Sequence, residues 1–172
     1  MRRTRSRKLP HRPWRLTMTS AYLVIESETD LALLRKLLPA ALASDLVFYA
    51  TKGRSSVYSA AGTLLSDRAR PVAILVDAHT QDPDEIQEKI SLANTILLPA
   101  TPLNVSFKVL QAVPTIASIL TEDPTTQELL TTQIDLSAVI DRLTSTQIHT
   151  LQQHPLIQQL IEFLSGLTRQ IA

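Results

Sequence analysis

The segment PVAILVD, from Pro71 to Asp77, constrains the fold more than any other part of this sequence. Its residues are apolar without alternation up to the final Asp, so neither face of a strand built from them can meet water. Strands that are buried on both faces are typical of parallel sheets, because crossover helices cover both faces of such sheets. The sequence therefore predicts a central parallel strand at residues 71–77.

Three further segments predict strands of the same sheet, at residues 21–26, 45–51 and 104–113. Helical patterns separate the four strands, with apolar residues recurring at intervals of three and four. These helices are predicted at residues 28–38, 55–67 and 82–98. The alternation of strands and helices predicts an α/β fold of the Rossmann-like kind, with a parallel four-stranded sheet flanked by helices.

Polar residues at the predicted helix starts are candidate N-caps. Thr29 or Asp30 is expected to cap the first helix and Ser55 or Ser56 the second. Asp82 is expected to cap the third helix, because a proline follows it and acids occupy the first turn.

The rest of the chain is predicted to be helical, at residues 115–133, 135–151 and 155–170. The last of these helices carries an apolar stripe, which is expected to pack on the sheet; a dimer or partner-helix surface is the alternative. The stripe consists of Leu156, Ile157, Leu160, Ile161, Leu164 and Leu167. We expect an α/β domain at residues 21–123 and a helical extension packed on it at residues 124–172.

The first 20 residues have a different character, and we expect them to be a disordered arm. Residues 1–15 carry seven of the 17 Lys and Arg residues and no acid, which leaves ten basic and 16 acidic residues and a net charge of −6 for the remainder. One interpretation is a basic arm that contacts nucleic acid. The other is that Met18 is the true start of the protein.

Composition excludes several classes of function. The chain has no cysteine, which excludes disulfides, thiol catalysis and cysteine-ligated metals, and a cytoplasmic location is expected. No apolar run approaches the roughly 20 residues that a membrane span needs, so no membrane association is expected.

Two carboxylates and a glycine fall at or just past the carboxyl ends of three predicted strands: Glu26, Gly53 and Asp77. Ligand sites of open α/β sheets lie at these strand ends. A carboxylate such as Asp77, directly after an apolar strand, needs a cation, a hydrogen bond or water if it is partly buried. These residues therefore mark the candidate site.

An acid, a glycine and a second acid follow three successive predicted strands, and this order resembles that of the Toprim domain. The Toprim domain occurs in topoisomerases, bacterial primases, small RNA-maturing nucleases and OLD-type (overcoming lysogenisation defect) nucleases. VIESETDLALLRKLL resembles its first motif, YATKGRSS its second and ILVDAHTQD its Asp-x-Asp motif. QAVPTIASILTED resembles the proline-containing segment after the fourth strand of OLD-type domains. The resemblance covers about residues 21–123 and implies a Toprim-like fold.

Two departures from the family bear on its chemistry. His79 stands where the second aspartate of Asp-x-Asp is usual, and Thr115 and Ala117 stand where acids are usual. The family's carboxylates bind Mg²⁺, which prefers oxygen ligands, whereas imidazole suits Mn²⁺, Zn²⁺ or iron. The expected cofactor is a divalent metal, Mg²⁺ or Mn²⁺, and three outcomes stay open. Glu26, Asp77 and a water bind the metal while His79 only supports these ligands, the site prefers a transition metal, or the site has lost catalysis and keeps a binding role.

The resemblance implies a role for each site residue. Glu26 would act as acid or base and Asp77 would hold the metal, with Glu26 and His79 as further ligands; Asp30 is a secondary candidate. Four residues at the predicted start of the second helix are candidates for binding phosphate or nucleic acid, since a helix N-terminus attracts anions. They are Lys52, Gly53, Arg54 and Ser55. Asp82 and Asp84 are expected instead to cap the following helix and to favour its N-terminus through their negative charge.

The leading hypothesis is a Toprim-like protein that cleaves phosphodiester bonds with a divalent metal, or otherwise handles DNA or RNA. An ATPase or other protein partner is expected if the chain resembles OLD-type nucleases, which carry an ATPase half, and a homo-oligomer is possible. The alternative is a degenerate Toprim relative that acts as a binding or regulatory module, since a body of negative charge suits broad DNA contact poorly. A third hypothesis is another doubly wound domain with an acidic pocket, such as a receiver-like domain.

Overall fold

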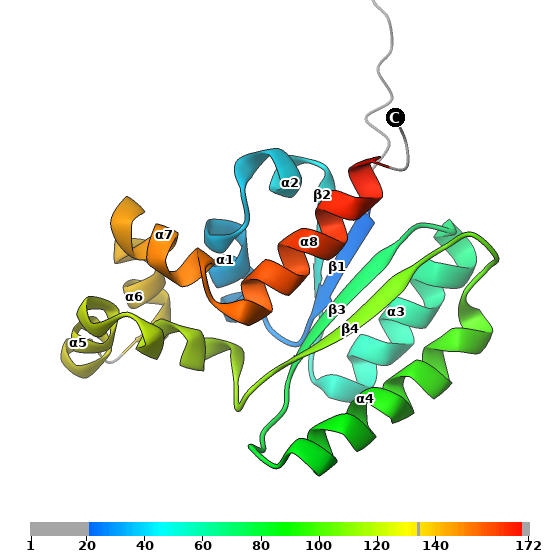
Figure 1. Cartoon of the computed structure of the whole chain (residues 1–172), viewed down its shortest axis with the longest axis horizontal. Helices are drawn as coiled ribbons and strands as arrows, with labels where there is room; N and C mark the ends of the chain where they lie inside the picture. Colours follow the sequence, from blue (N-terminus) through cyan, green and yellow to red (C-terminus); the bar gives the residue numbers. More distant parts are fainter. Residues whose placement is uncertain (1–20, 134, 170–172) are drawn as a thin grey trace, which may run out of the picture.

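The computed structural model describes residues 21–133 and 135–169, and the predictions for the N-terminal arm lie outside these residues. A parallel four-stranded sheet lies between two layers of helices (Figure 1). The predicted α/β class is confirmed, and the architecture is consistent with a Rossmann-like fold. In the described ranges, no helix is both long and apolar enough to cross a membrane.

Each strand lies inside its predicted range. The strands are β1 (Ala21–Ile25), β2 (Leu46–Ala50), β3 (Val72–Asp77) and β4 (Phe107–Ala112). Their order in the sheet is β2-β1-β3-β4, so β1 and β3 are central and β2 and β4 form the edges. The chain leaves β1 for a neighbour on one side and later returns to its other side, which makes the β1–β3 boundary the topological switch point of the sheet.

The helices that follow the strands also match prediction, with one addition. They are α1 (Glu28–Leu37), α3 (Arg54–Arg68) and α4 (Pro83–Leu97), the last extended by the 3-10 turn η1 (Leu98–Ala100). The short helix α2 (Ala40–Ser44) was not predicted, because its five residues are too few to show a helical period.

Two of the long helices predicted near the C-terminus are each divided in two. Residues 115–133 form the 3-10 helix η2 (Ile116–Glu122) and α5 (Pro124–Thr132), because Pro124 starts a new helix behind the cap Asp123. Residues 135–151 form α6 (Leu136–Arg142) and α7 (Ser145–Gln152). Here Thr144 and Gln147 form a capping box that begins α7.

Two of the three predicted N-caps are wrong by a few residues. Ser27 caps α1, and its Oγ accepts a hydrogen bond from the Asp30 N–H at 3.1 Å. Gly53 occupies the N-cap position of α3 without a side-chain bond, because the helix begins before Ser55. Asp82 caps α4 as predicted, accepting from the Asp84 N–H at 2.9 Å.

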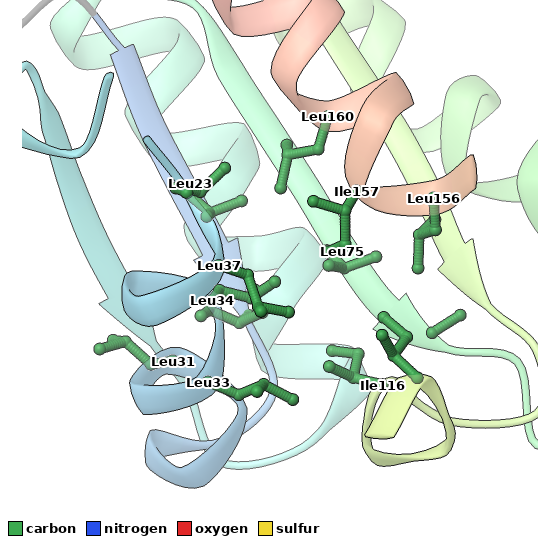
Figure 2. Packing of buried hydrophobic residues seen from close by; sticks show 14 of the residues in the cluster. Leu23, Leu31, Leu33, Leu34, Leu37, Leu75, Ile116, Leu156, Ile157 and Leu160 are labelled. Atoms are coloured by element: carbon green, nitrogen blue, oxygen red, sulfur yellow. The ribbon is translucent and has the colours of Figure 1, made fainter. Parts of the chain in front are cut away.

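Alternate residues of the strands enter two separate cores. On one face, Leu23 and Leu75 pack with α1 and with the last helix, α8 (Pro155–Arg169) (Figure 2). On the other face, Ile74 and its neighbours pack with α3 and α4. The apolar stripe of α8 therefore packs on the sheet as predicted, with all its members buried except the partly buried Ile161.

Candidate metal centre

The candidate site lies at the switch point between β1 and β3. Glu26 directly follows β1 and Asp77 is the last residue of β3, and these strands are neighbours in the sheet. One ligand atom from each of Glu26, Asp77 and His79 lies within 4.8 Å of the other two. The fold therefore brings together the three residues that were predicted as metal ligands, at the place where open α/β sheets bind their ligands.

Glu26 is held by bonds to both of its oxygens. Oε2 accepts a hydrogen bond from the main-chain N–H of Asp77 at 3.2 Å, and Oε1 lies 3.4 Å from Nε of Arg54 in an ion pair. Only 13% of its side chain is exposed. The carboxylate thus points into the site and is partly withdrawn from water.

Asp77 uses one oxygen for a structural bond. Its Oδ1 accepts a hydrogen bond from the main-chain N–H of Ile116 at 2.6 Å, whereas Oδ2 has no hydrogen-bond partner within the described ranges. Burial raises the pKa of the Asp77 carboxyl, and the charges of Asp30 and Glu26 raise it further, while the bond from Ile116 and the proximity of His79 lower it. A cation would relieve the cost of keeping this carboxylate ionised.

Asp30, the secondary candidate, lies close enough to Glu26 and Asp77 to interact electrostatically with both. Its Oδ2 accepts a hydrogen bond from the Ser27 hydroxyl at 2.6 Å. Burial raises the pKa of Asp30, the bond from Ser27 lowers it, and the charge of Glu26 raises it. Three carboxyl groups therefore interact electrostatically in one partly buried region.

His79 has an unusual backbone conformation beside the two carboxylates. Its φ angle is +53°, in the left-handed region, which costs a non-glycine residue roughly 1–2 kcal/mol. Its main-chain N–H donates to the carbonyl of Pro114 at 2.8 Å, which holds the loop in place. The imidazole is exposed, so it offers a ring nitrogen at the open side of the site.

Arg54, predicted to bind phosphate, reaches into the acidic site. Besides its ion pair with Glu26, its Nη2 donates to the main-chain carbonyl of Asp77. The Nε atom is buried and makes no hydrogen bond of good geometry to any described residue, although it lies within ion-pair distance of Glu26. The ion pair is the stronger interaction, since a guanidinium so close to a carboxylate balances its charge without ideal alignment. Arg54 thus supplies a permanent positive charge to the site.

The start of α3 forms an open surface next to Arg54. Lys52 and Ser55 are both exposed there. Gly53 has a φ angle of +92°, and a Cβ at this position would meet nothing within 4 Å, so glycine is required by the backbone conformation rather than by space. The first N–H groups of α3 remain available to an anion, because Gly53 provides no capping side chain.

Sequence reasoning missed two contributors to the site. The Tyr58 ring lies one helical turn beyond Arg54; burial raises the pKa of its hydroxyl, Arg54 lowers it and Glu26 raises it. The spacing of four residues on α3 was an available signal. Ile116 contributes its main-chain N–H. Because every residue except proline has this group, the residue type could not have indicated the contact. The segment after β4 thus reaches the site with its backbone, and neither Thr115 nor Ala117 adds a carboxylate.

Comparisons of the chain with protein-family models, with curated proteins and with solved structures give no match. The Toprim assignment therefore stays a prediction. What the chain does has to be inferred from the residues of the site and from their geometry.

Proposed function

We propose that this chain is a Toprim-like protein that binds a divalent cation and acts on phosphodiester bonds of DNA or RNA. One observation carries the proposal: ligand atoms of Glu26, Asp77 and His79 converge within 4.8 Å of one another. They do so at the switch point of a parallel sheet, where binding sites are expected.

The donor set suits a divalent cation of intermediate hardness. Two carboxylates offer oxygen ligands, and Oδ2 of Asp77 has no competing hydrogen bond within the described ranges. The third ligand is an imidazole, which Mg²⁺ accepts poorly and Mn²⁺ accepts well. We therefore propose Mn²⁺ over Mg²⁺ as the preferred ion.

A bound cation at this place would neutralise charge that develops on a phosphate and lower the pKa of a ligated water. The chain itself would supply the remaining functions. Oε1 of Glu26, once Arg54 leaves it, would either bind the cation or accept and return a proton, since Oε2 is held by the Asp77 N–H. Lys52, Ser55 and the first N–H groups of α3 would bind and orient the phosphate oxygens.

Arg54 would change partners during this cycle. In the free protein it balances the charge of Glu26, so it competes with a divalent cation for that carboxylate. When the cation binds, like charges separate, and the nearest new anion is a phosphate at the start of α3. Arg54 would therefore pair with Glu26 in the free protein and with a phosphate when the cation is bound.

The second candidate is a binding module without catalysis, recruited by a nucleic acid or by an ATPase or other protein partner. The Arg54–Glu26 ion pair favours it, because a permanent guanidinium can replace a metal ion. The absence of carboxylates at Thr115 and Ala117 favours it as well.

Metal titration together with a cleavage assay separates the two candidates. Mn²⁺ and Mg²⁺ are titrated by calorimetry into the wild type, into Asp77→Asn, and into Asp84→Asn as a control at an exposed acid outside the ligand group. Nicking of supercoiled DNA and cleavage of single-stranded RNA are measured on the same samples. Metal binding that only Asp77→Asn loses, with metal-dependent cleavage, supports the enzyme. Metal binding without cleavage supports the binding module, and no binding in the wild type removes the metal site itself.

A further inference from the structure

A groove of about 400 Å³ runs along the free edge of the sheet, beside β4. Its floor is β4, the edge strand; Ile86 and Ile90 of α4 form one wall, and Pro155 and Leu156 at the start of α8 form the other. These wall residues are apolar, while His154 and Gln159 add polar groups on the side of α8, so the groove offers both apolar and polar contacts beside an edge strand.

The outward face of β4 carries main-chain donors and acceptors. Val72 N–H donates to the Ser106 carbonyl at 3.2 Å, and Ala78 N–H donates to the Ala112 carbonyl at 2.8 Å. Since alternate residues of a parallel strand bond to the same neighbour, even-numbered residues of β4 pair with β3. The N–H and C=O groups of Val109 and Gln111 therefore point away from the sheet, into the groove.

Gln111 adds a second and independent signal. The residue is only 8% exposed, yet both side-chain amide atoms, Nε2 and Oε1, lack a hydrogen-bond partner among the described residues. A buried amide that is left unpaired costs about 1–3 kcal/mol. Gln111 lines the groove, and its unpaired amide belongs to the same residue as the outward main-chain groups, so a peptide group that enters the groove and reaches the amide could complement both.

We propose that this groove binds an extended, acidic segment of another protein, which adds to the sheet as a fifth strand beside β4. Strand addition satisfies the main-chain groups of Val109 and Gln111 and gives the Gln111 amide a peptide group to bond. Aliphatic side chains at alternate positions of the segment would lie against Ile86 and Ile90.

The charge of the groove lining favours one of the possible binding partners over the others. Lys108 and His154 are the ionisable residues that line the groove, and no acid of the described ranges lines it. The His154 ring is already engaged, since Nδ1 accepts from the Leu156 N–H and Nε2 lies 3.9 Å from Glu122, so Lys108 carries the positive charge of the groove. Residues 1–15 of this chain carry seven basic residues and no acid, so they do not complement it. A second copy of β4 brings FKVLQA, which has one lysine and no acid, so pairing between two copies places like charges together. A segment with acidic residues is the complementary partner.

The test uses random dodecapeptides displayed on phage, selected against the full chain, and measures the binding of recovered peptides by fluorescence anisotropy. We expect acidic peptides with alternating aliphatic residues, bound at least about tenfold more weakly by Gln111→Leu and by Lys108→Gln. Gln127→Leu, at an exposed glutamine of α5, is the matched control and should bind like the wild type. Failure to recover peptides, or equal binding by Gln111→Leu, would overturn the proposal.

Hydrogen exchange of individual amides, followed by NMR, locates the peptide. The N–H groups of Val109 and Gln111 should exchange fast in the free chain and become protected when the peptide binds, while Leu110 stays protected throughout. Protection of the two amides without peptide at every protein concentration would mean that the chain's own terminal segment fills the groove. Protection that grows with concentration would mean that a second copy does. Either result overturns the proposed occupant.

The melting temperature of Gln111→Leu gives a second readout that is independent of any ligand. Because the substitution removes an unpaired buried amide, it should leave the melting temperature unchanged or raise it. A clear fall would show that the amide is paired within the chain, which would also overturn the proposal.

Discussion

The main-chain N–H of Asp77 donates a hydrogen bond to Oε2 of Glu26 at 3.2 Å, and this bond ties the ends of two neighbouring strands together. It holds two acidic side chains side by side, although like charges repel each other. The second Glu26 oxygen meets Arg54 and one Asp77 oxygen meets the Ile116 N–H, so main-chain donors and one guanidinium support the pair. The arrangement can therefore form before any cation binds.

Arg54→Gln should tighten Mn²⁺ binding and weaken the binding of single-stranded nucleic acid. The substitution removes the positive charge that lies against Glu26, and it also removes a residue that we propose as a phosphate ligand at the start of α3. We expect each affinity to change by about tenfold, which corresponds to about 1.4 kcal/mol. Calorimetry and fluorescence anisotropy measure the two effects.

Arg68→Gln, in the last turn of the same helix, is the control for total charge and should leave Mn²⁺ affinity unchanged. If Arg54→Gln weakens Mn²⁺ binding instead, the guanidinium supports the metal site and does not compete with it.

Asp77→Asn should stabilise the metal-free protein at pH 7. The pKa of Asp77 is raised above its ordinary value of 3.8, chiefly by burial, so the folded state prefers the protonated carboxyl. The corresponding stability is complete below pH 3.8 and is lost as the pH rises through the raised pKa. Asparagine keeps an oxygen for the Ile116 N–H without the charge, so the gain should appear at neutral pH and vanish in acid.

Because solvent screens this half-buried group, we expect the gain at pH 7 to be small. Urea unfolding across the range from acid to neutral pH, in the presence of a chelator, measures it. A loss of stability at pH 7 would instead mean that the Asp77 charge has a favourable partner in the free protein.

Asp123→Asn should show the opposite dependence on pH. The carboxylate caps α5 and accepts from the N–H of Thr126 at 2.8 Å and from its hydroxyl at 2.9 Å. The bond from the Thr125 side chain and then those from Thr126 lower the pKa of Asp123 below its ordinary value of 3.8. Its stabilisation is therefore present above that value and is lost as the pH falls through the lowered pKa.

The melting temperature of Asp123→Asn should consequently fall below that of the wild type at pH 7, and the two should converge in acid. Equal melting temperatures at pH 7 would show that the helix start does not depend on the charge. Asp135→Asn, at the cap of α6, offers a comparison at an exposed residue.

Leu160→Ala should lower the free energy of unfolding by about 2–5 kcal/mol, because it leaves a cavity between α8 and the sheet. Leu160 is completely buried, on the same face of the sheet as Leu23 and Leu75 (Figure 2). Leu103→Ala is the matched control, since the side chain of Leu103 is 92% exposed and should cost little. Equal effects of the two substitutions in denaturant unfolding would mean that α8 is not part of the cooperative core.

Much of the fold was predictable because local patterns carry it. The continuous apolar run of β3 indicates burial on both faces, and Asp82 followed by Pro83 indicates a helix start. The errors also have local causes. Pro124 and Thr144 start new helices inside stretches that keep an apolar period, and periodicity alone does not report such breaks. Ser27 competes with its polar neighbours for one capping position, which sequence alone does not decide.

The sequence by itself determined which residues stand at the ends of strands, and so their positions in the chain were enough to indicate Glu26, Gly53 and Asp77 as candidate site residues. Only the tertiary structure decided that β1 and β3 are neighbours, that Arg54 lies against Glu26, and that the Ile116 N–H meets Asp77. The physical reason is that strand order and main-chain contacts between distant segments depend on how two cores pack on one sheet, whereas helix and strand periods depend on residues close together in the chain.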